Sequence, residues 1–317
     1  MATNGYKGSV PPEAFRDVKI AIIGGTGLYQ LDNVKHIAEF EPLTPWGYPS
    51  SPIHIVETAG GHKVAFLARH GRGHAYTPTS VPAQANIAAL KHLGVEAILA
   101  FSAVGSLRQE IKPRDFVIPD QIIDRTKGIR PSTFFETGLV AHAMFADPFD
   151  HTGIGQIVWN KARDVMVGEG VQMHLGGTVI CMEGPAFSTR AESNMYRSWG
   201  GSVINMSAIP EAKLAREAEI AYQMVCMSTD YDCWHEDEEA VTVEMVVGNL
   251  KANGGNARRV VEAVLPELEK AVWGRESAYT IGKGLKGSMK FACVTDPAKR
   301  DLAVVRKLEY ILPGYYS

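Results

Sequence analysis

The chain has 317 residues, 45% of them hydrophobic and 21% charged, a composition that excludes a disordered or fibrous protein and predicts a large buried core. Its 32 basic and 35 acidic residues give a formal net charge of -3 with no long block of one sign, so the sequence offers no nucleic-acid surface. No apolar run approaches the ~18 residues that cross a membrane. The four cysteines lack CxxC spacing, so we expect reduced thiols in a cytoplasmic protein and leave a nuclear location open.

Short apolar runs alternate with amphipathic segments along most of the chain. Residues 1–17 are polar and contain Gly and Pro, which predicts a flexible N-terminal tail. The patterns predict strands at 18–23, 53–58, 62–68, 95–101, 115–123, 176–182, 202–205 and 220–228. They predict helices at 83–93, 154–168, 189–198, 209–218 and 241–270, with a short one near 302–309.

This alternation predicts an α/β fold with a central mixed, largely parallel twisted sheet flanked by helices. No break in composition separates two domains, so we expect one domain at 18–272 and a C-terminal extension at 273–317. Two helix starts are well marked. Thr189 and Glu192 form a capping-box pattern, and Pro210 opens the next helix where a missing N–H costs nothing.

Ligands of such sheets bind beyond the carboxyl ends of the strands, where two glycine-containing turns stand out. Gly24-Gly25-Thr26-Gly27 suits an anion, or is a simple tight turn; Gln30 in place of a third glycine disfavours dinucleotide binding. The turn Arg69-His70-Gly71-Arg72-Gly73-His74 suits phosphate, or is a solvated basic turn. His70 and His74 as metal ligands are disfavoured, because glycines separate them and no third ligand is indicated.

Three further strand ends carry polar groups. Ser102-Ala103 and Asn205-Met206-Ser207 offer hydroxyls and close backbone approach, although core packing is the stronger interpretation of Met206 taken alone. Asp230 and Asp232 share a face if the strand persists, and a crowded, buried carboxyl can stay protonated and act as a general acid. The alternative is an acidic loop paired with Lys or Arg. Phe187 offers a flat face to a heterocycle, or is ordinary core.

Together these motifs resemble the trimeric purine nucleoside phosphorylase family, and within it the 5′-methylthioadenosine phosphorylases. The resemblance covers roughly residues 18–270. It is carried by IIGGTG at 22–27, LARHGRGH at 67–74, SAVGSLRQEI at 102–111, FVIPDQIIDRT at 116–126, EGPAFSTRAES at 183–193, VINMSAIPE at 203–211 and STDYDCW at 228–234.

The resemblance implies a role for each group of residues. The phosphate ligands are Thr26, Arg69, His70, Ser102, the Ala103 backbone and Ser207. The nucleoside lies against Phe187, Ser188, Asn205 and Met206, with Asp230 at purine N7 and Asp232 at the exocyclic amine. His142, Val243 and Val247 surround the methylthio group. Asp230, Asp232 and His70 are the implied catalytic residues.

The resemblance also implies the reaction: phosphorolysis of 5′-methylthioadenosine to adenine and 5-methylthioribose 1-phosphate. Phosphate is a co-substrate, no metal or organic cofactor is needed, and the assembly is a homotrimer with the C-terminal extension at a subunit boundary. The carboxylate pair favours a 6-amino over a 6-oxo purine, and phosphorolysis of adenosine or of inosine and guanosine is the alternative. Ser102, Ser207, Ala186 and Ala208 depart from residues common in the family.

Overall fold

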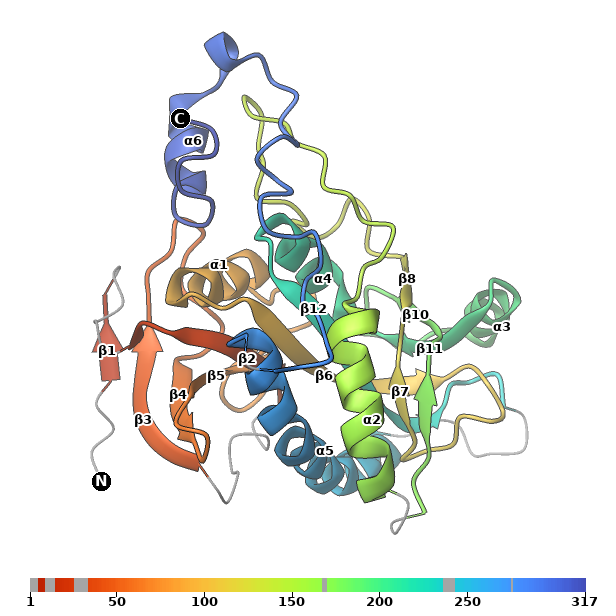
Figure 1. The fold of residues 1–317 in the computed structure, drawn as a ribbon. Coiled ribbons are helices and arrows are strands. Elements are labelled where there is room, and N and C mark those ends of the chain that lie inside the picture. Colours follow the sequence, from red (N-terminus) through yellow and green to blue (C-terminus); the bar gives the residue numbers. More distant parts are fainter. Residues whose placement is uncertain (1–4, 9–14, 26–33, 167–169, 236–242, 275) are drawn as a thin grey trace.

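A mixed sheet runs through the centre of the molecule (Figure 1). The computed structural model describes residues 5–8, 15–25, 34–166, 170–235, 243–274 and 276–317. The strands are β1 (Gly5–Lys7), β2 (Val18–Gly24), β3 (Val34–Glu41), β4 (Ile53–Thr58), β5 (Lys63–Ala68), β6 (Ala97–Ser106), β7 (Phe116–Ile118), β8 (Gln121–Asp124), β9 (Met173–Leu175), β10 (Thr178–Cys181), β11 (Gly201–Asn205) and β12 (Ala221–Tyr231). The helices are α1 (Ala83–Leu93), α2 (Gln156–Met166), α3 (Arg190–Ser198), α4 (Ala208–Glu217), α5 (Val243–Val272) and α6 (Leu302–Leu308).

Strand β6 lies at the centre of the sheet and pairs with three other strands. The strand order is β1-β3-β4-β5-β2-β6-β11-β10-β8. Along its first half β6 pairs in parallel with β2 and β12. At its carboxyl end it pairs antiparallel with β11, where Ile204 faces Gly105 and Val203 faces Ser106. The ends of β6, β11 and β12 therefore meet at one place. The prediction of a mixed, largely parallel sheet in one α/β domain is confirmed.

Helices cover both faces of the sheet. Helices α1 and α4 lie on one face and α2 and α5 on the other (Figure 1). Two large clusters of buried apolar side chains fill the spaces, one including Ile87 and Leu214 and the other including Val158 and Val260, and a smaller third cluster contains Ile180. The strands of the sheet's centre are buried on both sides, which is why they are nearly continuous apolar runs. No helix among those described is long and apolar enough to span a membrane.

Several predicted bounds need correction. The run at 115–123 forms two strands, β7 and β8, because Pro119 has no N–H to continue the ladder. Strands β6 and β12 extend beyond their predicted ends, so Ser102, Ala103 and Asp230 lie within strands rather than after them. Strands β3 and β9 were not expected, since charged side chains interrupt the first and the second has three residues.

The predicted flexible tail is wrong for part of residues 1–17. Strand β1 pairs in parallel with β3, and Phe15 is buried with its ring 5.7 Å from that of Phe40. Both helix-start predictions hold. Thr189 and Glu192 exchange both capping-box hydrogen bonds, and the non-helical backbone of Ile209 makes Pro210 the start of the regular part of α4.

The C-terminal extension rises from the sheet beside a long loop, residues 133–147 (Figure 1). We call these two segments the projecting arm. A backbone bridge joins Ala141 to Cys293, and the Glu219 carboxylate accepts the N–H groups of Gly287 and Met289 at 2.8 Å each. The extension is also part of the domain's own core, because side chains of α6 pack into the cluster beneath α1 and α4.

Candidate active site

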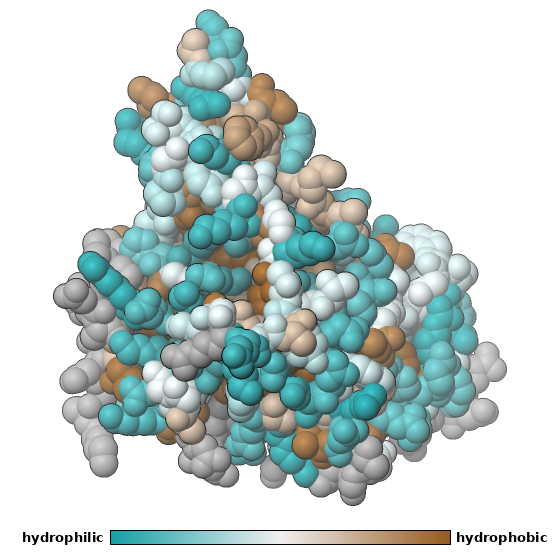
Figure 2. Space-filling model, viewed as in Figure 1, coloured by the Kyte–Doolittle hydropathy of each residue, from teal (hydrophilic) through white to brown (hydrophobic). Residues whose placement is uncertain are grey.

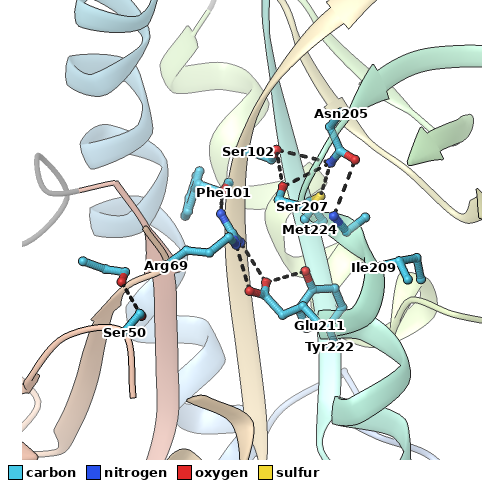
Figure 3. A network of polar contacts seen from close by, with 12 residues as sticks. Ser50, Arg69, Phe101, Ser102, Asn205, Ser207, Ile209, Glu211, Tyr222 and Met224 are labelled. Carbon is cyan, nitrogen blue, oxygen red and sulfur yellow. Dashed lines mark hydrogen bonds and ion pairs between the residues drawn. The ribbon is translucent and has the colours of Figure 1, made fainter. Parts of the chain in front are cut away.

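Arg69 follows β5, and three protein acceptors hold its buried guanidinium (Figure 3). Nε and Nη2 donate to the two carboxylate oxygens of Glu211 at 2.8 and 2.7 Å, and Nη1 donates to the Phe101 carbonyl at 2.8 Å. Burial alone would lower the pKa of Arg69, but the Glu211 carboxylate raises it, so the guanidinium stays charged. Of its five N–H groups, three are bonded within the described residues and two are left for a ligand.

Glu211, which the sequence did not single out, determines how Arg69 is presented. It lies in the first turn of α4, is 3% exposed, and also accepts a hydrogen bond from the Tyr222 hydroxyl at 2.8 Å. A bidentate carboxylate fixes the plane of a guanidinium as well as its position. The charge of Arg69 therefore has one orientation before any ligand arrives.

Two serines and one asparagine form a second cluster of donors beside Arg69 (Figure 3). The hydroxyls of Ser102 and Ser207 lie 2.8 Å apart, and Asn205 Nδ2 donates to them at 3.2 and 3.4 Å. Ser207 precedes α4, whose regular part begins at Pro210. The hydroxyls and Arg69 converge on one place, which is suited to an anion.

The same cluster changes the interpretation of Asn205. The sequence assigned this residue to the nucleoside, but its side chain is buried and holds the two phosphate-side serines. Its Oδ1 accepts the backbone N–H of Ala208 at 3.5 Å. Asn205 therefore orients the hydroxyls, and its predicted contact with the nucleoside stays a prediction.

His70 is held as a neutral ring. Its Nδ1 lies 3.0 Å from the Tyr76 carbonyl, and its ring stacks on that of His74 at a centroid distance of 4.2 Å. Burial, together with the adjacent Arg69 charge, lowers the pKa of His70 to about 4. Because a carbonyl oxygen only accepts, we assign the ring hydrogen to Nδ1 and leave Nε2 as an acceptor.

The metal alternative for His70 and His74 finds no support in this geometry. Their rings stack on each other, and Nδ1 of His70 is already bonded to Tyr76. Within the described residues, the group of side chains that could share an ion is His36, Glu39 and His54 on β3 and β4. Arg72 already donates to Glu39 at 2.6 Å there.

Asp230 and Asp232 lie on the same side of the end of β12, as the spacing predicts. A Cβ built on Gly105 would lie 3.1 Å from Asp230 Oδ1 and 3.4 Å from Asp232 Cβ. A bulge after Ser228 shifts the register of β12 against β6 at this point, a common device beside active sites. Both residues are 6% exposed, so they are buried at the end of the strand rather than on a solvated loop.

The two carboxylates are bonded differently. Thr229 Oγ1 donates to Asp230 Oδ2 at 2.6 Å. Oδ2 of Asp232 is buried without a hydrogen-bond partner among the residues that the structure describes. Burial raises the pKa of Asp232 by more than the neighbouring Ser193 hydroxyl and Cys233 N–H lower it. A buried carboxyl oxygen that lacks a partner is costly unless a ligand supplies one.

The segment that carries Phe187 and Ser188 lies against the carboxylate end of β12. Cys233 Sγ donates to the Ser188 carbonyl at 3.1 Å, and Arg190 Nε donates to the Cys233 carbonyl at 3.2 Å. Phe187 is 53% exposed, which excludes the alternative of an ordinary core aromatic. The structure thus brings an exposed aromatic ring to the segment beside Asp232.

Of the residues predicted to surround the methylthio group, the structure describes the side chain of His142. His142 is exposed on the projecting arm, where its backbone N–H donates to the Ala292 carbonyl at 3.0 Å. That backbone pairing extends the bridge between Ala141 and Cys293. The arm that carries this bridge rises away from the sheet (Figure 1).

Three other predicted site residues cannot be placed against these groups. Val243 and Val247 belong to α5, but their side chains lie outside the described residues. Thr26 lies outside them altogether. The predicted contacts of Thr26 with phosphate, and of the two valines with the methylthio group, therefore stay predictions.

The matching family model is the phosphorylase superfamily, which covers residues 19–266, and the chain belongs to this family. It is 59% identical over 307 residues to the S-methyl-5′-thioadenosine phosphorylase of Yarrowia lipolytica, covering 95% of this chain and 94% of the relative. It is 57% identical to the enzyme of that name from Tuber melanosporum, covering 96% and 99%.

Solved structures agree with this assignment. A methylthioadenosine phosphorylase from an Antarctic soil metagenomic library superposes with a TM-score of 0.82 at 43% identity, covering 94% of this chain and all of that one. A methylthioadenosine phosphorylase from Schistosoma mansoni in complex with adenine gives a TM-score of 0.75 at 31% identity, covering 87% and 98%. The family resemblance inferred from the motifs is therefore confirmed.

Proposed function

We propose that this chain catalyses the phosphorolysis of 5′-methylthioadenosine to adenine and 5-methylthioribose 1-phosphate. One observation carries the proposal: a preorganised anion site at Arg69, Ser102 and Ser207 stands at the same end of the sheet as two buried carboxylates. A phosphate and a purine are the two groups that these sites fit. The names of relatives 57–59% identical over most of the chain support the same reaction.

In the proposed reaction a phosphate oxygen bonds to the anomeric carbon as the bond from that carbon to purine N9 breaks. Positive charge develops on the sugar and negative charge on the purine. Phosphate at Arg69 places its own negative charge beside the sugar. His70 Nε2, an acceptor, takes the hydrogen bond of the protonated phosphate oxygen. Donors fixed before the reaction need no reorganisation, and each is worth about 3 kcal/mol in typical enzymes.

At the base, Asp230 is assigned to N7 and Asp232 to the exocyclic amine. Burial raises the pKa of Asp232, and Asp230 is buried beside it, so a proton can be held at this end of β12. That proton, or its hydrogen bond, stabilises the departing purine. The unpartnered Oδ2 of Asp232 accepts from a 6-amino group and would repel a 6-oxo group. No metal or organic cofactor takes part in these steps.

The 5′ side of the site is proposed to be completed by another copy of the chain in a homotrimer. The projecting arm that carries His142 has exposed apolar side chains, among them Met144 (80% exposed) and Phe291 (87% exposed). Figure 2 shows brown apolar surface on this projection. Covering it with a second subunit would remove that surface from water. Four free cysteines in the chain support the cytoplasmic location.

The test of the activity is chromatographic detection of free base from methylthioadenosine, adenosine and inosine, each with and without phosphate. We expect adenine from methylthioadenosine only with phosphate. Release without phosphate would indicate a hydrolase, and no release would indicate a binding protein. Hypoxanthine from inosine at a similar rate would favour the alternative, a phosphorylase for other purine nucleosides.

Light scattering coupled to size exclusion tests the trimer, and a hybrid assembly tests the arm. We expect His142→Ala subunits mixed with Asp232→Asn subunits to regain activity that neither has alone. This requires His142 of one subunit to serve the carboxylates of another. Mixtures no more active than the separate variants would contradict a shared site.

A further inference from the structure

A buried arginine that the sequence did not single out, Arg130, joins two segments of the site. Its Nη1 donates to the carbonyls of Met206 and Ile209, both at 2.7 Å. Its Nη2 donates to the Glu183 carbonyl at 2.6 Å, and its Nε to Glu183 Oε2 at 3.1 Å. The side chain is 2% exposed, so solvent does not compete for these bonds.

The two segments that Arg130 joins carry different parts of the proposed site. Residues 206–209 begin α4 and include Ser207 of the phosphate cluster. Residues 182–188 follow β10 and lead to Phe187 and Ser188 on the base side. Glu183 also accepts a hydrogen bond from Thr79, in the loop that follows the Arg69 turn. One guanidinium thus connects the phosphate side with the base side.

The segments also touch directly. A Cβ built on Gly184 would overlap the Met206 sulfur, so the thioether lies against the turn at Gly184. The ladder between these strands ends where the Met182 N–H donates to the Asn205 carbonyl at 2.9 Å, because β10 ends at Cys181 and β11 at Asn205. The bonds of Arg130 replace ladder bonds at the point where both strands have ended.

We propose that Arg130 is a positioning residue for the phosphorolysis proposed above: it sets the spacing between the phosphate and ribose wall at Met206–Ser207 and the base wall at 183–188. It touches neither substrate itself. This positioning role requires a guanidinium, because its N–H donors on several nitrogen atoms reach carbonyls in two segments at once. A lysine ammonium donates from one nitrogen atom only.

The kinetic signature follows from this position. A residue that contacts phosphate alone raises the KM for phosphate alone. A residue that sets the spacing between two walls lowers the rate of the step that needs both, and a displacement of about 1 Å can cost about 100-fold in rate. We expect Arg130→Ala to lower kcat about 100-fold while both KM values change by less than about threefold.

The test compares Arg130→Ala and Arg130→Lys with Val260→Ala. The control removes two buried methyl groups from the apolar cluster on the α2 and α5 face and lowers the melting temperature without touching the site. We expect a normal kcat for Val260→Ala, a kcat for Arg130→Lys between those of wild type and Arg130→Ala, and partial recovery of Arg130→Ala in millimolar guanidinium or methylguanidinium. If Arg130→Ala does not fold, Arg130→Lys with the same control decides.

Two results would overturn the inference: a kcat for the Arg130 variants no lower than that of Val260→Ala, or a loss confined to the KM of one substrate. Failure of the proposed function is recognised separately, because wild type would then release no adenine. In that case calorimetric titration of adenine in the presence and absence of phosphate replaces kcat. The inference then requires phosphate to tighten adenine binding in wild type and not in Arg130→Ala, and equal coupling in both would reject it.

Discussion

The buried pair of Arg69 and Glu211 allows a prediction whose size follows from its geometry. Two hydrogen bonds of 2.8 and 2.7 Å join side chains that are 5% and 4% exposed. Removing one partner of such a pair leaves an uncompensated charge in the interior and costs about 3–5 kcal/mol. We therefore expect Arg69→Met and Glu211→Gln each to lower the free energy of unfolding by about that amount.

The double variant separates the pair from its surroundings. With both charges gone no buried charge is left alone, so the loss in Arg69→Met/Glu211→Gln should fall short of the sum of the single losses by up to about 3 kcal/mol. The measurement is urea denaturation at one fixed protein concentration, because association contributes to apparent stability. Lys307→Met, which breaks an exposed pair with Glu136, is the control and should cost about 1 kcal/mol or less.

Kinetics of the same variants test the role of the pair. Arg69→Met should raise the KM for phosphate by far more than the KM for nucleoside, and Glu211→Gln should do so to a smaller extent, since it loosens the guanidinium without removing it. Single losses that add to within about 0.5 kcal/mol would refute the energetic coupling. A phosphate KM unchanged in Arg69→Met would refute the assignment of the anion site.

Three further predictions concern the carboxylates and His70. Asp232→Asn should lower kcat/KM for methylthioadenosine about 100-fold, and inosine much less, because the amide turns a donor toward the 6-amino group; equal losses in a steady-state assay would contradict this. Gly105→Ala places a methyl group 3.1 Å from Asp230 Oδ1, so activity should fall about tenfold and the free energy of unfolding by about 1–3 kcal/mol. Unchanged activity would mean that the Asp230 carboxylate can move aside without loss of function. Because the pKa of His70 falls from 6.5 unfolded to about 4 folded, its stabilising contribution is present above pH 6.5 and is lost as pH falls toward 4. Between pH 7 and pH 4.5 the urea midpoint of His70→Gln should fall less than that of wild type. If the two midpoints fell equally with pH, the His70 ring would not be buried in its neutral form.

The sequence predicted where a helix begins or ends when the capping residues within and beside that helix determine its bounds. Helix α1 occupies the predicted residues, and Gly94, with φ of 100°, ends it as a left-handed cap. Helix α3 begins at its predicted capping box. Strands β6 and β12 were predicted too short because their last residues are small or polar. These last residues stay extended because β6 and β12 pair with each other, and β11 pairs with the end of β6. Such pairing between distant segments cannot be seen in a local sequence pattern.

The same distinction separates the site residues that the sequence indicated from those it did not. Arg69, Ser102 and Asp230 were found because each stands where an apolar run in the sequence gives way to polar residues, a change that is visible in one segment. Arg130 was missed because each of its partners lies more than 50 positions away and its own segment has no regular pattern. Glu211 did carry a signal: it is an acidic side chain in the mostly small and apolar run SAIPEAKLA, where a charge on the buried face needs a partner. A charge at an apolar position therefore indicates that a partner exists, but only the fold shows that the partner is Arg69, 142 positions away.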